Sequence, residues 1–199
     1  NAEILARFGT PKQKAQFLQP LLDGKIASCY SMTEPQAGAD PAEFTCRAER
    51  DGDGWVINGE KWFASHARFA EFLLVMVVTN PERPIHEGAS ILLIEKNTVG
   101  LEILRNAAVG PYVEQGDGVH GYLRFTDCHV PAENLLGEEG KGFLVAQTRL
   151  GGGRIHHAMR SVGVLKKAMD MMCERVLSRT TKGELLANKQ FTQEKIADT

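Results

Sequence analysis

The sequence has little of what marks several common classes of protein. Its four cysteines are widely spaced and form no CxxC pair, so we expect neither a disulfide framework nor a metal site. The formal net charge of −2 provides no excess of positive charge for binding nucleic acid or an anionic membrane. The longest apolar run, residues 69–78, is too short and too interrupted to span a bilayer. A protein of a reducing compartment is therefore expected, and its partners must be inferred from local chemistry.

An initiator methionine and a signal peptide are also missing from the sequence. The chain begins at Asn1 and ends at Thr199, in both places within a helical pattern of apolar residues. We therefore expect these 199 residues to be part of a longer chain. Their composition, 43% hydrophobic and 24% charged, is that of a folded protein large enough for one domain or for parts of two.

Helices are predicted at the start of the chain and β-strands in its middle. Residues 1–8 and 11–22 have helical periodicity, with Thr10 suited to the N-cap that precedes the second helix. From about residue 28 to residue 131, short β-branched or aromatic runs alternate with turn signals, which is typical of a sheet meander or small barrel. Asn58–Gly59, placed between two alternating runs, predicts a β-hairpin. Further strands are predicted at residues 72–78, 90–96 and 121–130.

Helical periodicity returns after residue 142. A long helix is predicted from Phe143 to about Ser178, with residues 151–153 interrupting it, and a second helix at residues 184–198. Helices followed by an all-β middle and more helices indicate an α+β fold. No GxGxxG motif follows a strand, and "GEEGKG" lacks the Lys-Ser/Thr ending of a phosphate loop, so any bound nucleotide must be held in another way.

The segment "YSMTEPQAGADPAEF", residues 30–44, has the composition of a binding loop. Pro35 pushes Glu34 toward extended geometry, and Gly38 permits close backbone approach. Exposed N–H groups and the Thr33 hydroxyl would form a hydrogen-bonding shelf for a flat, acceptor-rich ring. The alternative, which this loop by itself favours, is a turn in which Thr33 and Asp40 only cap local backbone.

A second candidate feature is "NGEKWFASHA", residues 58–67. Trp62 and Phe63 are adjacent on a predicted strand, so we expect them on opposite faces, while Phe63 and Ser65 share one. An aromatic side chain with a hydroxyl two residues further on would suit a stacked ring with a polar edge. The alternative is that the aromatic residues fill the core and Ser65 ends a strand.

Five motifs, in this order, resemble the acyl-CoA dehydrogenase family. They are "YSMTEPQAGAD", "VINGEKWFASHA", "VPAENLLGEEGKGF", "RLGGGRIHHAMRSVG" and "SRTTKGELLANKQ". Each motif is weak alone, but their order and spacing make the resemblance specific. The fourth motif further resembles the subgroup typified by family members ten and eleven of animals, which act on longer or modified acyl chains.

The resemblance implies a fold, a reaction and partners. Residues 1–27 would be the end of a helical N-terminal domain, residues 28–136 a central β-domain, and residues 137–199 the start of a C-terminal helical domain. The implied reaction is FAD-dependent α,β-dehydrogenation of an acyl-CoA to trans-2-enoyl-CoA, as in the β-oxidation of fatty acids. The implied acceptor is electron-transfer flavoprotein or a similar protein, and the implied assembly is a homodimer or homotetramer. The expected location is cytoplasmic, or the mitochondrial matrix or peroxisome in a eukaryote.

The resemblance also implies roles for particular residues. Met32 and Thr33 would meet the edge of the flavin ring, with Gly38 and Ala39 nearby in the same loop. Phe63 would lie beside the ring and Ser65 near the hydride-accepting nitrogen. Further along the chain, the residues matching family positions are Arg154 near CoA, and Arg179 and Gln190 at the FAD of a neighbouring subunit. A guanidinium fork suits a diphosphate, although a helix-end charge and a surface ion pair are the simpler interpretations of the two arginines.

The sequence departs from the family pattern at three points. Ala39 replaces a common serine that would touch the flavin or thioester region, and Lys182 replaces an aromatic residue expected to stack on the cofactor. The catalytic base is expected beyond Thr199, because the alternative family position, just before Arg154, is Gly153 here. The glycines at 151–153 indicate either a roomy pocket for a long or substituted acyl chain or a simple kink.

Other functions remain open at this stage. A flavin-dependent oxidase or monooxygenase of the same fold would differ in the rapid reaction of its reduced flavin with oxygen. A non-catalytic, DNA-associated flavoprotein is disfavoured by the charge balance, and a stand-alone module without cofactor by the helical pattern at both ends. His156 and His157 are adjacent, about 100° apart around a helix, and so suit packing or hydrogen bonding more than shared metal binding.

Overall fold

The computed structural model describes residues 1–109 and 119–199. It divides into two compact units, residues 1–149 and residues 150–199, each of which is described by itself. Within the described residues, no helix combines the length and the apolar character that crossing a membrane requires.

Short helices open the first unit. They are α1 (Ala2–Phe8), α2 (Pro11–Gln13), the π-helical η1 (Lys14–Leu18) and α3 (Gln19–Leu22). Thr10 and Gln13 form a reciprocal capping box, which confirms the predicted N-cap. Pro20 has no N–H to donate within a helix, and just before it the Gln19 N–H bonds five residues back, to Lys14 O. The predicted pair of N-terminal helices is thus confirmed, with a π turn inside the second.

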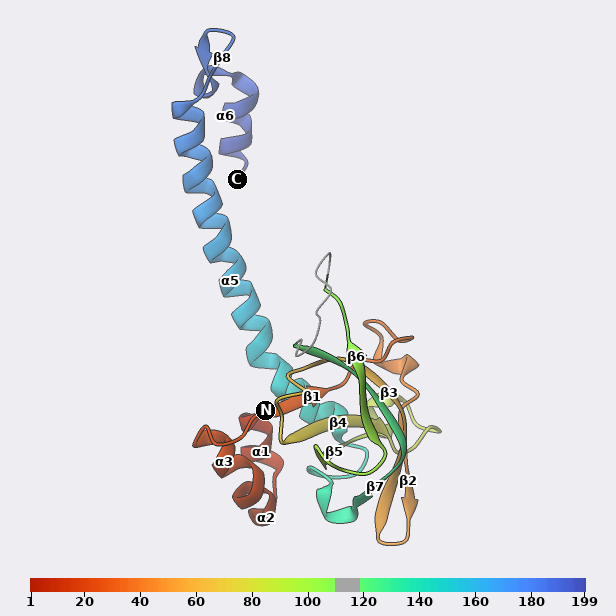
Figure 1. Cartoon of the computed structure of the whole chain (residues 1–199). Coiled ribbons are helices and arrows are strands. Elements are labelled where there is room, and N and C mark those ends of the chain that lie inside the picture. Colours follow the sequence, from red (N-terminus) through yellow and green to blue (C-terminus); the bar gives the residue numbers. More distant parts are fainter. Residues whose placement is uncertain (110–118) are drawn as a thin grey trace. The chain divides into compact units, whose positions relative to one another are not determined.

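One curled sheet makes up most of the first unit (Figure 1). Its strands run in the order β1-β4-β2-β3-β7-β6, and β5 pairs with β4 outside this path. The strands are β1 (Ser28–Ser31), β2 (Arg47–Asp51), β3 (Gly54–Ser65), β4 (Phe72–Val78), β5 (Ala89–Glu95), β6 (Leu101–Asn106) and β7 (His120–Pro131). Short helical segments between them are η2 (Pro41–Glu43), α4 (Ile85–Gly88) and η3 (Ala132–Asn134).

The hydrophobic core lies on both faces of the sheet at β4. Because successive side chains of a strand point to opposite faces, Leu73 and Val75 join a cluster with residues of β3 and β7. Phe72 and Leu74 join a second cluster with α1, η1 and the first turns of α5. Burial on both faces explains why β4 is a continuous apolar run, FLLVMVV, instead of an alternating one.

The predicted hairpin at Asn58–Gly59 is wrong, because both residues lie inside the single strand β3. The Asn58 side chain bonds to Asp127 of β7 through two contacts, Asn58 Nδ2 to Asp127 Oδ1 (3.1 Å) and Asp127 N to Asn58 Oδ1 (2.9 Å). The ladder between β3 and β7 shifts register at this point. Gly59 has φ +139°, and a Cβ there would lie 2.6 Å from Cys46 Cα. The turn signal therefore marks a bulge with close backbone approach.

Helix α5 (Gly142–Ser178) begins in the first unit and continues into the second. It runs through residues 151–153, so the predicted interruption is wrong; three glycines lower helix propensity, by about 1 kcal/mol each relative to alanine, without ending this helix. After it come the hairpin of β8 (Thr180–Thr181) and β9 (Glu184–Leu185), the 3₁₀ turn η4 (Leu186–Asn188) and α6 (Gln190–Ala197). The last predicted helix thus begins later than expected, at Gln190.

Candidate functional site

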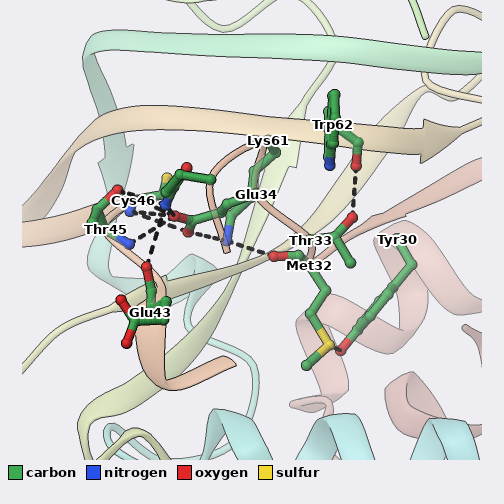
Figure 2. Close-up of polar contacts among 10 residues, drawn as sticks. Tyr30, Met32, Thr33, Glu34, Glu43, Thr45, Cys46, Lys61 and Trp62 are labelled. Carbon is green, nitrogen blue, oxygen red and sulfur yellow. Dashed lines mark hydrogen bonds and ion pairs between the residues drawn. The ribbon is translucent and has the colours of Figure 1, made fainter. Parts of the chain in front are cut away.

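The loop after β1 is held against β3 by a pair of hydrogen bonds between Thr33 and Trp62. The Trp62 N–H donates to Thr33 O at 3.0 Å. The Thr33 hydroxyl donates to Trp62 O at 2.8 Å, and Figure 2 shows this second bond. The hydroxyl therefore contacts a ligand only as an acceptor in this arrangement. The Thr33 N–H has no acceptor among the described residues and remains as the donor of the predicted shelf.

Those two bonds coincide with a second irregularity of β3. The pairing of β3 with β7 shifts between Lys61 and Ala64, where the backbone of Trp62 bonds to the loop, and Phe63 adopts φ +50°. As a result the rings of Trp62 and Phe63 contact each other, with centroids 4.7 Å apart. The prediction that they lie on opposite faces is wrong, because the positive φ interrupts strand alternation.

Phe63 and Ser65 meet a common neighbour, His120 of β7. The Ser65 Oγ lies 2.9 Å from His120 Nδ1, and the Phe63 ring centroid lies 6.3 Å from that of His120. The Phe63 side chain is 39% exposed, unusual for a large aromatic residue beside a core strand. The predicted association of Phe63 with Ser65 is therefore present, on a surface open to a ligand.

Behind this surface lies an ion pair that sequence reasoning missed. Lys61 Nζ is 2.7 Å from Glu34 Oε1, and the two side chains are 0% and 1% exposed (Figure 2). Lys61 also donates to Met32 O at 2.8 Å, and the Glu34 carboxylate accepts from the N–H groups of Thr45 (2.7 Å) and Cys46 (3.1 Å). Burial raises the pKa of Glu34, but Lys61 and the N–H donors outweigh it, so the pKa lies below its usual range. The sequence held one signal for this pair: Lys61 lies an even number of residues after Trp55 and Ile57, and so on the inward face of the same strand.

The remainder of the loop is held locally. The Asp40 side chain accepts from Ala42 N at 2.9 Å and caps η2, so the local capping role considered for Asp40 is present. Gly38 has φ +56°, and a Cβ there would meet nothing within 4 Å. Its backbone conformation therefore favours glycine here, whereas no neighbouring atom would crowd a larger side chain. Gly38 and Ala39 are both exposed.

Comparison with known protein families matches two successive regions of the chain to the same family. Residues 29–128 match the acyl-CoA dehydrogenase middle domain, and residues 140–199 match the acyl-CoA dehydrogenase C-terminal domain. The chain belongs to the acyl-CoA dehydrogenase family. The family resemblance found in the sequence and the α+β fold are thereby confirmed.

Two curated relatives and two solved structures show how much of the length of related proteins this chain covers. A probable acyl-CoA dehydrogenase of Mycobacterium tuberculosis is 44% identical over 99% of the chain and 49% of its own length. Acyl-CoA dehydrogenase family member 11 of Gallus gallus is 38% identical over 100% of the chain and 26% of its own length. The structure of an acyl-CoA dehydrogenase from Geobacillus kaustophilus superposes with a TM-score of 0.81 at 32% identity, over 98% of this chain and 51% of that one. A glutaryl-CoA dehydrogenase from Mycobacterium smegmatis in complex with FADH2 gives 0.78 at 25% identity, over 99% and 48%. The chain thus spans between 26% and 51% of the length of these relatives.

The second unit carries the other residues for which the sequence resemblance implies a role. Arg154 lies on α5, Arg179 between α5 and β8, and Gln190 at the first residue of α6, and all three are exposed. Lys182, which stands where the family commonly has an aromatic residue, has φ +49° and forms the β8–β9 turn with Gly183. His157 bonds to Arg160 on the same helix, at 2.8 Å, as expected for a hydrogen-bonded histidine.

Proposed function

We propose that this chain forms the flavin-binding half of an enzyme that carries out FAD-dependent α,β-dehydrogenation of an acyl-CoA thioester to trans-2-enoyl-CoA. The observation that carries the proposal is the exposed Phe63 ring, whose centroid lies 4.7 Å from that of Trp62 and 6.3 Å from that of His120, the residue that also contacts the Ser65 hydroxyl. An exposed aromatic ring with a few converging polar groups is the composition of a site for a flat heteroaromatic ligand.

The chemistry of the donor set fits a flavin. An isoalloxazine ring offers several acceptor atoms and one N–H along its polar edge. The Thr33 N–H supplies a donor without an acceptor among the described residues, and the Thr33 Oγ1 supplies an acceptor, since its own hydrogen is directed to Trp62 O. Met32 precedes this pair. Its carbonyl accepts from the buried Lys61 and its sulfur from the Tyr30 hydroxyl, so both groups are already engaged within the chain. Gly38 and Ala39 would approach the cofactor through backbone.

The residues of this chain would bind and orient the cofactor, but removal of the α-proton needs a base that they do not provide. FAD, when bound, would supply the acceptor for the hydride from the β-carbon of the thioester, and a carboxylate would be needed to remove its α-proton. Glu34 is unsuited to this role, because it is buried, is paired with Lys61 and has a lowered pKa, whereas a general base needs a pKa near the working pH. Gly153 has no side chain for it. We therefore place the base outside residues 1–199.

The residues of the second unit would make contacts of their own with the cofactor and CoA. Arg179 and Gln190 would contact the FAD diphosphate region of a neighbouring subunit, and Arg154 the CoA moiety. A guanidinium group donates bidentate hydrogen bonds to phosphate oxygens. The proposed enzyme is accordingly a homo-oligomer that passes electrons to electron-transfer flavoprotein or a similar acceptor. A Cβ at Gly151 to Gly153 would meet nothing within 4 Å, which is compatible with space for a long or substituted acyl chain.

The test is the visible spectrum of the purified protein, followed by anaerobic titration with acyl-CoAs of different chain length and branching. Loss of the oxidised flavin absorbance with one class of thioester is the expected result, and that class identifies the substrate. A flavin that stays oxidised with every thioester but, once reduced, reacts rapidly with oxygen would instead indicate an oxidase or monooxygenase. A protein that binds no FAD would contradict the proposal.

A further inference from the structure

The buried pair of Glu34 and Lys61 lies directly behind the two segments that the proposed flavin site uses. Neither side chain reaches the surface, and the proposed reaction gives neither of them a chemical step. We propose that Lys61 is a positioning residue: by holding the Met32 carbonyl in the interior, it directs the Thr33 N–H toward the flavin. This inference rests on the proposed function, because it assigns a role within the same site.

The direction of the Thr33 N–H follows from the geometry of one peptide unit. All described peptide bonds are trans, and in a trans peptide the carbonyl and the following N–H point in opposite directions. The Met32 carbonyl accepts from Lys61 Nζ at 2.8 Å, and Lys61 is 0% exposed. The Thr33 N–H of the same peptide therefore points away from the buried lysine.

The Glu34 carboxylate in turn fixes Lys61 and closes the loop. Its Oε1 accepts from Lys61 Nζ and from the Cys46 N–H, and its Oε2 accepts from the Thr45 N–H (Figure 2). The end of the loop is thereby tied to Glu34, and its start is tied through the Met32 carbonyl to Lys61. Charge-assisted hydrogen bonds of this kind are short and directional. A shift of Lys61 would release the Met32 carbonyl and rotate the peptide that presents the donor.

The simpler explanation is that the pair serves stability alone, and the physics of buried ion pairs argues against it. Removing two charges from water offsets most of their attraction, and apolar residues of similar volume are often as stabilising or more so. What apolar residues cannot supply is a fixed hydrogen-bond direction at Met32 O. Replacing both charges together therefore distinguishes a role in stability from a role in orienting the Met32 carbonyl.

The experiment compares FAD affinity with stability in three variants of the whole protein. Glu34→Met with Lys61→Met removes the pair without leaving a lone charge, Glu34→Gln keeps the Lys61 contact to Met32 O, and Lys12→Met breaks an exposed ion pair with Glu133 as the matched control. FAD is titrated into each apoprotein and followed by flavin fluorescence and visible absorbance. The melting temperature of each apoprotein is measured in parallel.

We expect the double variant to stay folded but to bind FAD about tenfold more weakly, the size expected for one lost directional hydrogen bond, with a shifted flavin spectrum. Glu34→Gln, whose amide oxygen can still accept from Lys61 Nζ, should weaken FAD binding less than the double variant does, and Lys12→Met should not change it. A folded double variant with wild-type affinity and spectrum would overturn the inference and leave the proposed function intact. A wild-type protein that binds no FAD would overturn the proposed function itself.

A second measurement decides the matter if the double variant does not fold. In wild-type protein labelled with ¹⁵N-threonine, with the signal assigned through Thr33→Ser, FAD should slow hydrogen exchange of the Thr33 amide and shift its resonance. An amide that exchanges equally fast with and without bound FAD would overturn the inference.

Discussion

The Ser65 hydroxyl lies 2.9 Å from Nδ1 of His120, so the residue proposed to contact the hydride-accepting part of the flavin is itself oriented by a neighbouring strand. Ser65→Ala is expected to weaken FAD binding or flavin reduction by up to about tenfold, the range of one hydrogen bond. His120→Leu should have a smaller effect in the same direction, because it frees the hydroxyl without removing it. Rapid-reaction measurement of flavin reduction by acyl-CoA checks both. Equal rates in Ser65→Ala and the wild type would exclude a role for this hydroxyl.

Phe63 is expected to provide the aromatic contact to the flavin. Phe63→Ala removes a ring that is 39% exposed and available for stacking, and aromatic pairs contribute about 0.5–1.5 kcal/mol beyond the area they bury. We expect roughly tenfold weaker FAD binding with little loss of stability. Phe69→Ala, at an aromatic residue 48% exposed and only six positions further on, is the control. If both variants lose FAD equally, the effect is not specific to Phe63.

Glu34 should make stability depend on pH at the acid end. Because the folded state lowers the pKa of this carboxyl, its contribution is present above the ordinary carboxyl pKa of about 4.3 and is lost as pH falls through the lower folded-state value. Thermal unfolding between pH 7 and pH 3 should therefore show a steeper loss of stability for the wild type than for Glu34→Gln. At pH 7 Glu34→Gln should be destabilised by about 3 kcal/mol, because it leaves Lys61 without its counter-charge. Parallel acid limbs for the two proteins would contradict the lowered pKa.

Two glycines should respond to alanine in opposite ways. Gly59→Ala places a Cβ 2.6 Å from Cys46 Cα at φ +139°, and we expect it to destabilise the protein by about 3 kcal/mol. Gly152→Ala has open space and a helical backbone, and should stabilise α5 by about 1 kcal/mol. Denaturant unfolding measures both. The activity of Gly152→Ala tests the hypothesis that these glycines make a roomy pocket. That hypothesis predicts a greater loss of activity with long acyl-CoAs than with short ones.

Thiol reactivity should separate the cysteines by burial. Burial raises the pKa of Cys29 to about 12, of Cys46 to about 12 and of Cys128 to about 11. Since the thiolate is the reacting form, these three should stay unmodified by a thiol reagent in the native protein and react on unfolding. Cys173 is only half-buried, and Cys173→Ser should remove whatever native labelling occurs. Rapid native labelling of the Cys173→Ser variant would show that the core opens more readily than the structure implies.

The sequence predicted well those elements whose pattern is set by local physics. Strand β4 was recognised because both of its faces are buried, which makes it a long apolar run, and the Thr10 cap because its hydrogen bonds join residues three apart. The long helix α5 was recognised by its periodicity, but glycines were given too much weight as helix breakers. Strands β1, β2 and β6 were not individually predicted. Strand β1 pairs with β4, which is distant in sequence, whereas β2 and β6 are mostly exposed and have no apolar run to mark them.

The errors at the candidate site all concern long-range contacts. Asn58–Gly59 has the composition of a hairpin turn, and only its contacts with Asp127 and Cys46 show that it is a bulge. Trp62 and Phe63 would alternate in a regular strand, and only the bonds to Thr33 show why they do not. The loop's candidate residues were found from their chemistry, whereas the lysine behind them is defined by a partner 27 positions away.

The number of residues between the two irregularities of β3 is fixed by contacts at both of them. Gly59 must meet Cys46, and two residues later Lys61 must face inward to meet Glu34 and Met32. Because a one-residue shift turns every side chain of a strand to the opposite face, an insertion or deletion here would move the lysine to the outside. A deletion would also bring Trp62 into the charged interior. The length of this short stretch of strand should therefore be as restricted as its residues at positions 59 and 61.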